Sequence, residues 1–416
     1  KAKKIIPGVS QLFGKRPELS LPGKKWPIYY SKAKGINLWD LDGKKYYDFR
    51  LVGIGTWVLG YSDNDINKVA KKIIDQGSMS TLNPPEDVLL AEEMIKLHPW
   101  AGGVKYTRSG GESMAVAIRI ARAFTGKEKV LFCGYHGWHD WYLAANLKSK
   151  DKLSYHLLPG IKPKGVPKYL KNSTIPFRFN NWEDLNKIIK KNAKNCAAIV
   201  IEPARENYPD KKYIKKLREI ATKNNAVLIF DEITSGWRMT VGGIHKIIKV
   251  NPDIVVYGKT IANGIPMGVI VGKKNVMNSS TKTFISSALW TERLGPACAL
   301  EFIKKFKRKK VYKKIIFNGK KIKSIWKKNA KKHNLDIEVK GIDALASFKI
   351  KSKNWPAIIT FFIQEMLIKH QIIANSQCYA NYMHTDESLK KYDMAVSDVF
   401  SRISKLNTQG KLEKKL

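Results

Sequence analysis

Two short apolar runs near the middle of the chain each lead to a polar residue that can act in chemistry. Ala226–Phe230 is followed by Asp231, and Ile254–Tyr257 is followed, after one glycine, by Lys259. Runs of four to eight apolar residues rich in Val and Ile predict strands that are buried on both faces of a sheet. In an open α/β sheet, ligands bind outside the carboxyl ends of such strands. We therefore expect Asp231 and Lys259 to face one crevice.

The same kind of pattern predicts the elements around this pair. Strand-like and helical segments alternate from Val104 to Gly272, which favours a mainly parallel sheet with helices on both faces. Gly35–Tyr47 carries two strand-like runs around Asp-Gly, the signature of a hairpin. Thr283–Ala299 is predicted to be a loop, and a helical stretch from Leu300 to about residue 332 precedes a smaller α+β unit. Further predicted elements are helices at 63–77, 85–97 and 355–370 and strands at 336–340 and 345–350.

Composition narrows the classes of function. The formal net charge of +41 would suit a nucleic-acid-binding protein, but only 12 of the 76 basic residues are arginine, the side chain with the bidentate fork. The lysines are spread from end to end, so we interpret them as a solvated surface and expect no nucleic-acid partner. No apolar run approaches the ~20 residues needed to cross a bilayer, so we expect no membrane role. The four separated cysteines and the absence of a secretory signal pattern indicate a cytoplasmic protein without disulfides or a metal site.

Asp231 and Lys259 are the two side chains that pyridoxal phosphate requires from a protein. A lysine amine condenses with the aldehyde of this cofactor, and a carboxylate keeps its ring nitrogen protonated. On spacing alone, an aspartate at the edge of the core and one surface lysine among many explain the pattern equally well. Ser109-Gly110-Gly111 lies between a strand-like run and a helix, where free backbone N–H groups would bind the cofactor phosphate. Such a triplet is also an ordinary helix cap.

Other residues at the ends of predicted strands could complete this site. Tyr135 or His136, after the strand at 129–133, could stack on a flat ring, although a buried aromatic cluster is the commoner use of such residues. Glu202 ends another buried strand, and Thr291 is a hydroxyl donor in a loop bounded by Gly and Pro. The Gly-rich segment Leu51–Gly60, which contains Trp57, predicts either a tight crossing or a close approach of backbone to a ligand.

Several of these motifs together resemble the class III (ornithine-type) aminotransferases, and most closely their glutamate-1-semialdehyde 2,1-aminomutase-like branch. The resemblance covers nearly the whole chain. The matching segments are LWDLDGKKYYDF at 38–49, RSGGESMAVAIRIARAFTGKEKV at 108–130, GYHGWHD at 134–140, LIFDEITSGWR at 228–238, YGKTIANGIPMGVIVGK at 257–273 and SQCYANYMHTDESL at 376–389.

The resemblance implies the fold and the role of each matching residue. It implies fold type I, with a mainly parallel seven-stranded sheet in a large domain (66–300) and a small α+β domain built from both chain ends (1–65 and 301–416). Lys259 would be the Schiff-base lysine and Asp231 the partner of the ring nitrogen, with Ile233 and Tyr135 on the two faces of the ring. Thr291 would reach the phosphate of a neighbouring subunit, which implies a homodimer with shared active sites. The other residues that the resemblance places around the cofactor are Ser109, Gly110, Gly111, His136 and Glu202.

Two positions depart from the aminomutase pattern. Relatives often have Thr or Ser where this chain has Gly111, so one hydroxyl contact to phosphate is missing. In the aminomutase an arginine near the N-terminal strand binds the substrate carboxylate, whereas residues 26–35 contain none. Lys25, Lys32, Tyr29 and Arg238 are the possible substitutes, and Trp57 is a further candidate for substrate contact.

We therefore expect a pyridoxal-phosphate-dependent enzyme that transfers an amino group, with pyridoxamine phosphate as its second cofactor form. The substrate would be an amino acid or an amino-carbonyl compound, and the reaction either transamination or 2,1-amino migration. The alternatives are a lyase or racemase that uses the same cofactor, and a basic nucleic-acid-binding protein on an enzyme scaffold.

Overall fold

The chain forms two compact units. The computed structural model describes residues 1–20, 26–149, 152–156, 160–208, 210–410 and 412. One unit joins Lys1–Asp63 to Lys313–Leu416, and the other comprises Asn64–Tyr312. A boundary at 300/301 would fall inside helix α11 (Leu294–Arg308), which packs on α3 (Asn64–Asp75) and α4 (Pro85–Leu97). The domain limits expected from the sequence, 66–300 for the large domain and 1–65 with 301–416 for the small one, therefore stay a prediction.

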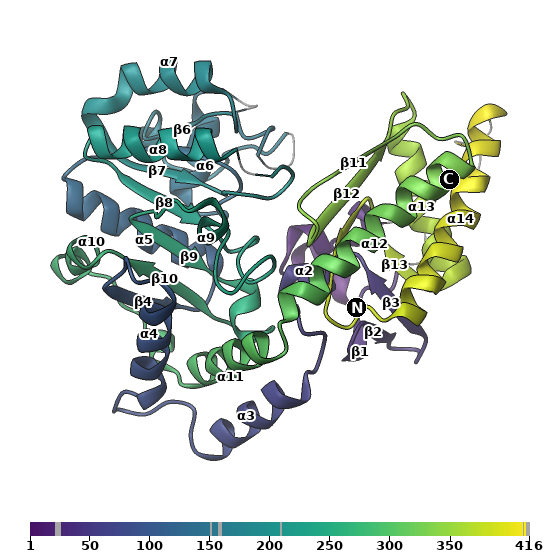
Figure 1. Cartoon of the computed structure of the whole chain (residues 1–416), viewed down its shortest axis with the longest axis horizontal. Helices are drawn as coiled ribbons and strands as arrows, with labels where there is room; N and C mark the ends of the chain where they lie inside the picture. Colours follow the sequence, from purple (N-terminus) through teal and green to yellow (C-terminus); the bar gives the residue numbers. More distant parts are fainter. Residues whose placement is uncertain (21–25, 150–151, 157–159, 209, 411, 413–416) are drawn as a thin grey trace. The chain divides into compact units, whose positions relative to one another are not determined.

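The unit Asn64–Tyr312 is built on a seven-stranded sheet with the order β4-β10-β9-β8-β7-β5-β6 (Figure 1). Only β10 runs antiparallel to its neighbours, which confirms the mainly parallel sheet. The strands are β4 (Gly103–Thr107), β5 (Lys129–Cys133), β6 (Thr174–Pro176), β7 (Cys196–Ile201), β8 (Val227–Asp231), β9 (Ile254–Tyr257) and β10 (Gly268–Gly272). Every residue of β7, β8 and β9 is buried, as expected of strands covered on both faces.

Helix α5 (Gly110–Thr125) is the central helix of this unit. Its buried residues Met114, Ala117, Ile118 and Ala121 recur at helical spacing and pack on alternate residues of the strands, such as Val200 and Ile229 in one buried cluster. Helix α8 (Lys211–Lys223) packs on β7 and β8. The remaining helices are α6 (Asp140–Leu143), α7 (Trp182–Asn192), α9 (His245–Ile248) and α10 (Lys274–Met277).

Helix α11 begins earlier than the sequence indicated. It starts at Leu294 rather than at Leu300, because the carboxylate of Glu292 accepts hydrogen bonds from the backbone N–H groups of Leu294 and Gly295 at 2.7 and 2.9 Å. Those donors would otherwise lack partners in the first turn of the helix. The predicted loop therefore ends before this point.

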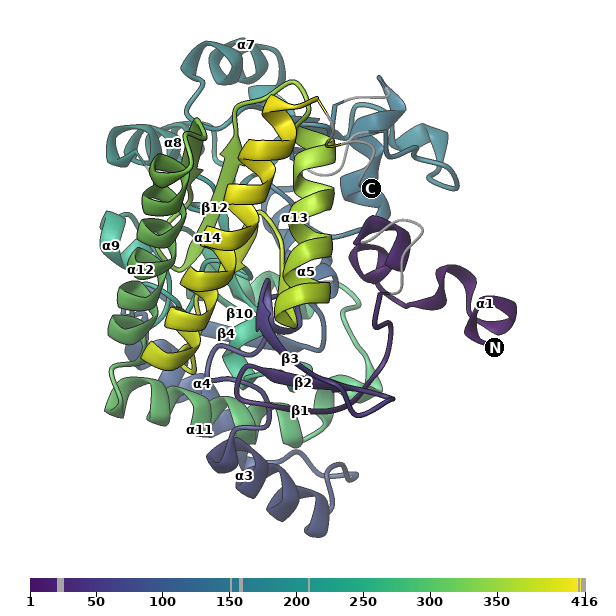
Figure 2. The ribbon, with the colours of Figure 1, turned by 90° about the vertical axis from the view of Figure 1, so that its right-hand side faces the viewer.

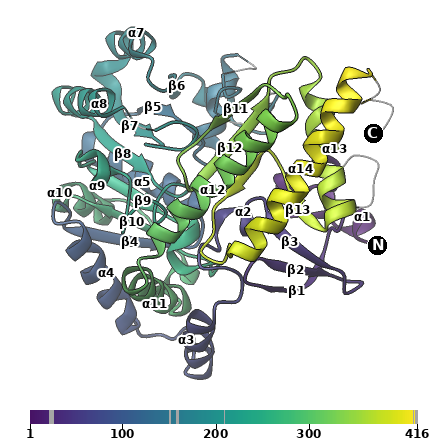
Figure 3. The same cartoon turned by 45° about the vertical axis from the view of Figure 1, so that its right-hand side comes forward.

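The unit made from both chain ends contains two small sheets. Figure 3 shows the sheet β1-β2-β3-β13, in which the predicted hairpin pairs β2 with β3 antiparallel and β13 adds in parallel to β3. The second sheet has the order β11-β12-β14. The strands are β1 (Tyr30–Lys34), β2 (Asn37–Asp40), β3 (Lys45–Phe49), β11 (Ile337–Lys340), β12 (Leu345–Ile350), β13 (Ile372–Ala374) and β14 (Gln377–Tyr379), and the short helices are α1 (Ala2–Ile5) and α2 (Val52–Gly55).

Three long helices pack in this unit: α12 (Val311–Lys332), α13 (Trp355–His370) and α14 (Asp386–Thr408) (Figure 2). Ion pairs join α12 to α14, from Lys321 to Asp386 at 2.8 Å and from Lys328 to Asp393 at 2.6 Å. Helix α12 also presents a lysine-rich furrow, lined by Lys320, Lys323, Ser324, Lys327, Lys328 and Lys331.

The Gly-rich segment before α3 contains a tight crossing. Gly53 has φ +66°, and a Cβ added there would lie 2.3 Å from Cδ1 of Trp57. The indole therefore packs directly on the glycine backbone, an approach that a larger residue would block. Among the described residues, no helix is both long enough and apolar enough to cross a membrane.

Candidate active site

Five loops bring the predicted site residues to one edge of the large sheet. Ser109 follows β4, Tyr135 and His136 follow β5, Glu202 follows β7, Asp231 ends β8, and Lys259 follows β9. These strands are parallel, so their carboxyl ends lie at the same edge. This is the edge at which ligands bind in open α/β sheets.

Asp231 is a buried carboxylate held in place by two contacts. Its Oδ2 lies 2.8 Å from Nδ1 of His136, and its Oδ1 accepts a hydrogen bond from the backbone N–H of Ile233 at 3.0 Å. Burial and the nearby charge of Glu202 raise the pKa of Asp231, while His136 opposes that rise. A carboxylate in this position is stabilised by a positive partner, because burying an uncompensated charge costs several kcal/mol or more.

Lys259 follows the next strand and is partly buried. Its Nζ donates a hydrogen bond to Oγ1 of Thr234 at 2.7 Å. Burial first, and then the positive charge of Arg205, lower the pKa of Lys259 to about 8, against the opposing effects of Glu202 and Asp231. At that pKa roughly a tenth of the lysine is an uncharged amine at pH 7. Its backbone φ of +44° is unusual for a residue with a side chain, a kind of strain that clusters at functional sites.

Glu202 connects the loops after β5 and β7. Its Oε2 accepts a hydrogen bond from the backbone N–H of Tyr135 at 2.9 Å and lies 3.4 Å from Nη1 of Arg205. Burial works to raise the pKa of Glu202, but Arg205 and His136 hold it below its usual value. Glu202 is therefore an anion in the folded protein, and it fixes the backbone of Tyr135.

The N-terminus of α5 forms a cradle around Gly110 and Gly111. Ser109 caps the helix in a capping box with Glu112, whose Oε2 accepts from the backbone N–H of Ser109 at 2.9 Å. A Cβ on Gly110 would lie 3.1 Å from Cδ1 of Ile233, and a Cβ on Gly111 would lie 2.8 Å from Cε1 and Nδ1 of His139.

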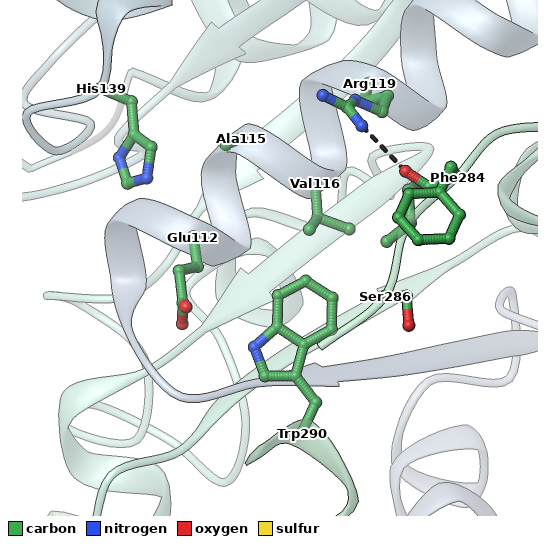
Figure 4. A pocket seen from close by; sticks show the side chains of 9 residues that line it. Glu112, Ala115, Val116, Arg119, His139, Phe284, Ser286 and Trp290 are labelled. Carbon is green, nitrogen blue, oxygen red and sulfur yellow. Dashed lines mark hydrogen bonds between the residues drawn. The ribbon is translucent and has the colours of Figure 1, made fainter. Parts of the chain in front are cut away.

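His139 therefore fills the space that a Thr or Ser side chain at position 111 would need. Its Nδ1 is buried without a hydrogen-bond partner among the described residues. A cavity of about 310 Å³ lies along the same helix, lined by Glu112, Val116, Arg119, His139, Phe284 and Trp290 among others (Figure 4).

The sequence matches one known family over most of its length. The profile of the family described as aminotransferase class-III matches residues 20–378. This chain belongs to the class-III aminotransferases. Membership confirms the predicted resemblance, amino-group transfer as the activity, and pyridoxal phosphate as the cofactor of the family, and it favours these over a lyase, a racemase or a nucleic-acid-binding protein.

Curated relatives cover most of the chain. A 3-aminobutyryl-CoA aminotransferase of Cloacimonas acidaminovorans (strain Evry) is 28% identical over 97% of this chain and 96% of its own. A glutamate-1-semialdehyde 2,1-aminomutase of Methanocaldococcus jannaschii is 30% identical over 91% of this chain and 92% of its own. Among solved structures, the PLP internal aldimine form of the FumI protein of Sphingopyxis sp. MTA144 matches with a TM-score of 0.88 at 19% identity. The match covers 98% of this chain and 95% of the FumI chain, so the two proteins share one fold.

The residues of this class-III aminotransferase fit pyridoxal phosphate. The buried carboxylate of Asp231 suits a protonated ring nitrogen, and Nζ of Lys259 is an amine of lowered pKa. The first backbone amides of α5 and the partnerless Nδ1 of His139 suit a phosphate.

Thr291 lies in a loop that is tied to this cradle through Arg108. The hydroxyl of Thr291 donates to the carbonyl of Ala288 at 2.8 Å. On either side of it, the carbonyls of Trp290 and Glu292 accept from Nη2 of Arg108 at 3.1 and 2.8 Å, and the Glu292 carboxylate pairs with Nε of Arg108 at 2.8 Å. Arg108 immediately precedes Ser109, so one side chain fixes this loop next to the start of α5.

The candidates for substrate contact are distributed over both units. Tyr29 and Trp57 belong to the unit made from the chain ends, where the Tyr29 hydroxyl donates to the carbonyl of Val9 at 3.0 Å and the Trp57 carbonyl accepts from Asn381. Arg238 belongs to the other unit and is 1% exposed, with Nε donating to the carbonyl of Thr234 at 2.6 Å. Lys25 lies outside the described residues.

Four residues that sequence reasoning did not single out lie at this site: Arg108, His139, Arg205 and Thr234. Thr234 lies three positions after Asp231, within a segment that already drew attention. Arg108 and Arg205 stand in loops without a periodic pattern, and His139 stands in the aromatic-rich segment 134–140. Only the fold shows what these three side chains contact.

Proposed function

We propose that this chain is a transaminase that moves an amino group between two small molecules with pyridoxal 5′-phosphate bound at the carboxyl edge of its large sheet. The observation that carries this proposal is the pair formed by buried Asp231 and the low-pKa amine of Lys259 on adjacent strands of one sheet. Bound there, the cofactor supplies an aldehyde for amines and a ring that accepts the electrons of a broken Cα bond.

Each residue has a stated task at that site. Lys259 would hold the cofactor through Nζ, and the same atom would accept the Cα proton of the substrate. Asp231 keeps a proton on the ring nitrogen, and His136 orients that carboxylate. Ile233 and Tyr135 would contact the two faces of the ring, and Glu202 fixes the backbone of Tyr135.

The phosphate is held at the start of α5. The backbone amides of Gly110 and Gly111 and the hydroxyl of Ser109 would donate to it. His139 replaces the missing hydroxyl side chain at position 111, which its buried Nδ1 supports.

The substrate of this proposed transaminase differs from glutamate-1-semialdehyde. Residues 26–35 contain no arginine, the side chain that the aminomutase pattern uses for the substrate carboxylate. A second candidate function is 2,1-amino migration within one molecule, which the 30% identity to the M. jannaschii aminomutase favours.

We also propose a cytoplasmic homodimer in which Thr291 reaches the phosphate of the partner. The loop that carries Thr291 supports this, because Phe284 and Leu289 are 84% and 64% exposed in a single chain. Buried, unpaired cysteines at all four positions support a reducing compartment. Sedimentation of the purified protein tests the dimer.

The reaction is tested by mixing the cofactor-loaded enzyme with amino donors and following both absorbance and products. A transaminase forms a carbonyl product stoichiometric with its cofactor from donor alone and turns over when an acceptor is added. Continuous turnover of one amino-carbonyl compound into its positional isomer would show the aminomutase instead. An unchanged spectrum with every donor, in protein shown to bind the cofactor, would contradict amino transfer.

A further inference from the structure

A cavity next to the proposed active site presents an arginine that neither the family pattern nor the sequence singled out. The cavity has a volume of about 250 Å³ and lies among the loops that follow β5, β6 and β7. Its lining includes Arg205, Arg178, Glu202, Tyr155 and His156. All of these belong to the unit Asn64–Tyr312.

Arg205 links this cavity to the site of chemistry. Its guanidinium lies 3.4 Å from Glu202, and the same Glu202 oxygen accepts from the backbone of Tyr135. The charge of Arg205 is also the largest charge effect on Lys259, whose pKa it lowers. Arg205 is therefore joined to the loops of the proposed site through Glu202, which lines the same cavity.

The side chain of Arg205 is more exposed than that of Arg238, the other arginine whose charge lowers the pKa of Lys259. Arg238 is 1% exposed, whereas the side chain of Arg205 is 33% exposed and lines the cavity. Arg205 is therefore the more accessible of these two arginines. Arg178, at the same cavity, lies over the ring of Tyr155 with its Cζ 5.0 Å from the centroid, and adds a second positive charge.

We propose that Arg205 binds a carboxylate of the amino substrate, in place of the arginine that is missing from residues 26–35. A planar guanidinium donates two parallel hydrogen bonds to a carboxylate, the geometry best suited to this task. Glu202 lies 3.4 Å from Nη1 of the Arg205 guanidinium, and both residues line the cavity. This inference rests on the proposed amino transfer and names the substrate class: amino compounds with a carboxylate.

The test compares donors that differ only by this group. Wild type, Arg205→Ala, Arg205→Lys and the control Arg308→Ala are loaded with cofactor and mixed with 4-aminobutyrate or 1-aminobutane, and with alanine or ethylamine. Arg308 is a suitable control because it is 55% exposed on α11 and pairs only loosely with Asp65, at 3.8 Å. The concentration that half-saturates the spectral change of the cofactor is measured for each.

The expected result is a loss confined to carboxylate-bearing donors. Arg205→Ala raises the half-saturating concentration of these donors about 10- to 100-fold, because a charge-assisted hydrogen-bonded pair is lost. It changes the half-saturating concentration of the plain amines less than about twofold. Arg205→Lys restores part of the loss, and Arg308→Ala matches wild type. A purely structural role through Glu202 would instead raise the half-saturating concentration of both donor types alike. That outcome, or no change for carboxylates, would overturn the assignment.

A direct measurement of ligand binding tests the role of Arg205 independently of the proposed reaction. Calorimetric titration with glutarate, which has carboxylates but no amine, should show at least tenfold weaker binding to Arg205→Ala than to wild type. If no donor changes the wild-type spectrum, amino transfer fails as the function, while the glutarate titration still decides the role of Arg205. Equal binding of glutarate to both proteins would overturn it.

Discussion

The contact between Gly111 and His139 gives a prediction in which two effects of opposite sign compete. Gly111 is the second residue of α5, where alanine favours the helix over glycine by up to about 1 kcal/mol. Yet the added Cβ would lie 2.8 Å from two ring atoms of His139, closer than real Cβ contacts. Overpacking of this kind costs about 1–3 kcal/mol. Gly111→Ala should therefore lower the free energy of unfolding by roughly 1–2 kcal/mol.

The effect of Gly111→Ala on the free energy of unfolding should change sign when the His139 ring is absent. In a His139→Ala background the new methyl meets no imidazole, so Gly111→Ala should be neutral or stabilising by up to about 1 kcal/mol. The His139 ring is stacked on Trp138 at a centroid distance of 4.5 Å, which restricts its escape in the single variant. The coupling between the two substitutions is then about 1–3 kcal/mol.

Urea denaturation of the four cofactor-free proteins, followed by circular dichroism, measures this cycle. The Gly111→Ala variant carries the same change in helix propensity as the double variant, and the His139→Ala variant carries the same loss of ring packing. Each single variant therefore serves as a control for the double variant. Stabilisation by Gly111→Ala in the presence of His139, or a coupling near zero, would refute the reasoning that His139 occupies the place of a side chain at position 111.

Further predictions concern the charged residues of the site. Lys259→Ala should slow product formation about 10²- to 10⁴-fold with unchanged circular dichroism, and a smaller loss would contradict its role as the proton carrier. In the wild-type protein, the rate at which the cofactor-free form takes up pyridoxal phosphate should rise about tenfold per pH unit up to pH ~8 and level off above it, because only the uncharged amine of Lys259 reacts and its pKa is about 8. Arg205→Ala should move this profile to higher pH, because the positive charge of Arg205 lowers that pKa. An unmoved profile would contradict this charge effect. Asp231→Asn should slow the half-reaction with the fold intact, and equal rates would show that no carboxylate is needed at the ring nitrogen. Glu232→Ala should destabilise the protein by about 3–5 kcal/mol in urea denaturation, because the buried carboxylate accepts four hydrogen bonds of 2.7–3.1 Å, and a loss under about 1 kcal/mol would contradict this.

The sequence predicted what depends on local pattern. Strands such as Val227–Asp231 are continuous apolar runs, and their ends position Asp231 and Lys259 because parallel strands share one carboxyl edge. Long-range pairing was not predictable in this way: β13 (Ile372–Ala374) joins β3 from the far end of the chain. Arg205 was missed because one basic residue in a polar loop of a chain with 76 of them carries no local signal.

The lysine furrow on α12 has a consequence for how this protein must be handled. Like charges along one helix face repel one another, and the repulsion extends about 30 Å in 0.01 M salt but only about 10 Å at 0.1 M. Two of these lysines, Lys323 and Lys328, pair with Asp343 and Asp393 at 3.1 and 2.6 Å, so dilute buffer strengthens these attractions together with the repulsion. The salt concentration therefore changes two opposing contributions at α12, and a purification that removes salt strengthens both the repulsion along this helix and its ion pairs to α14.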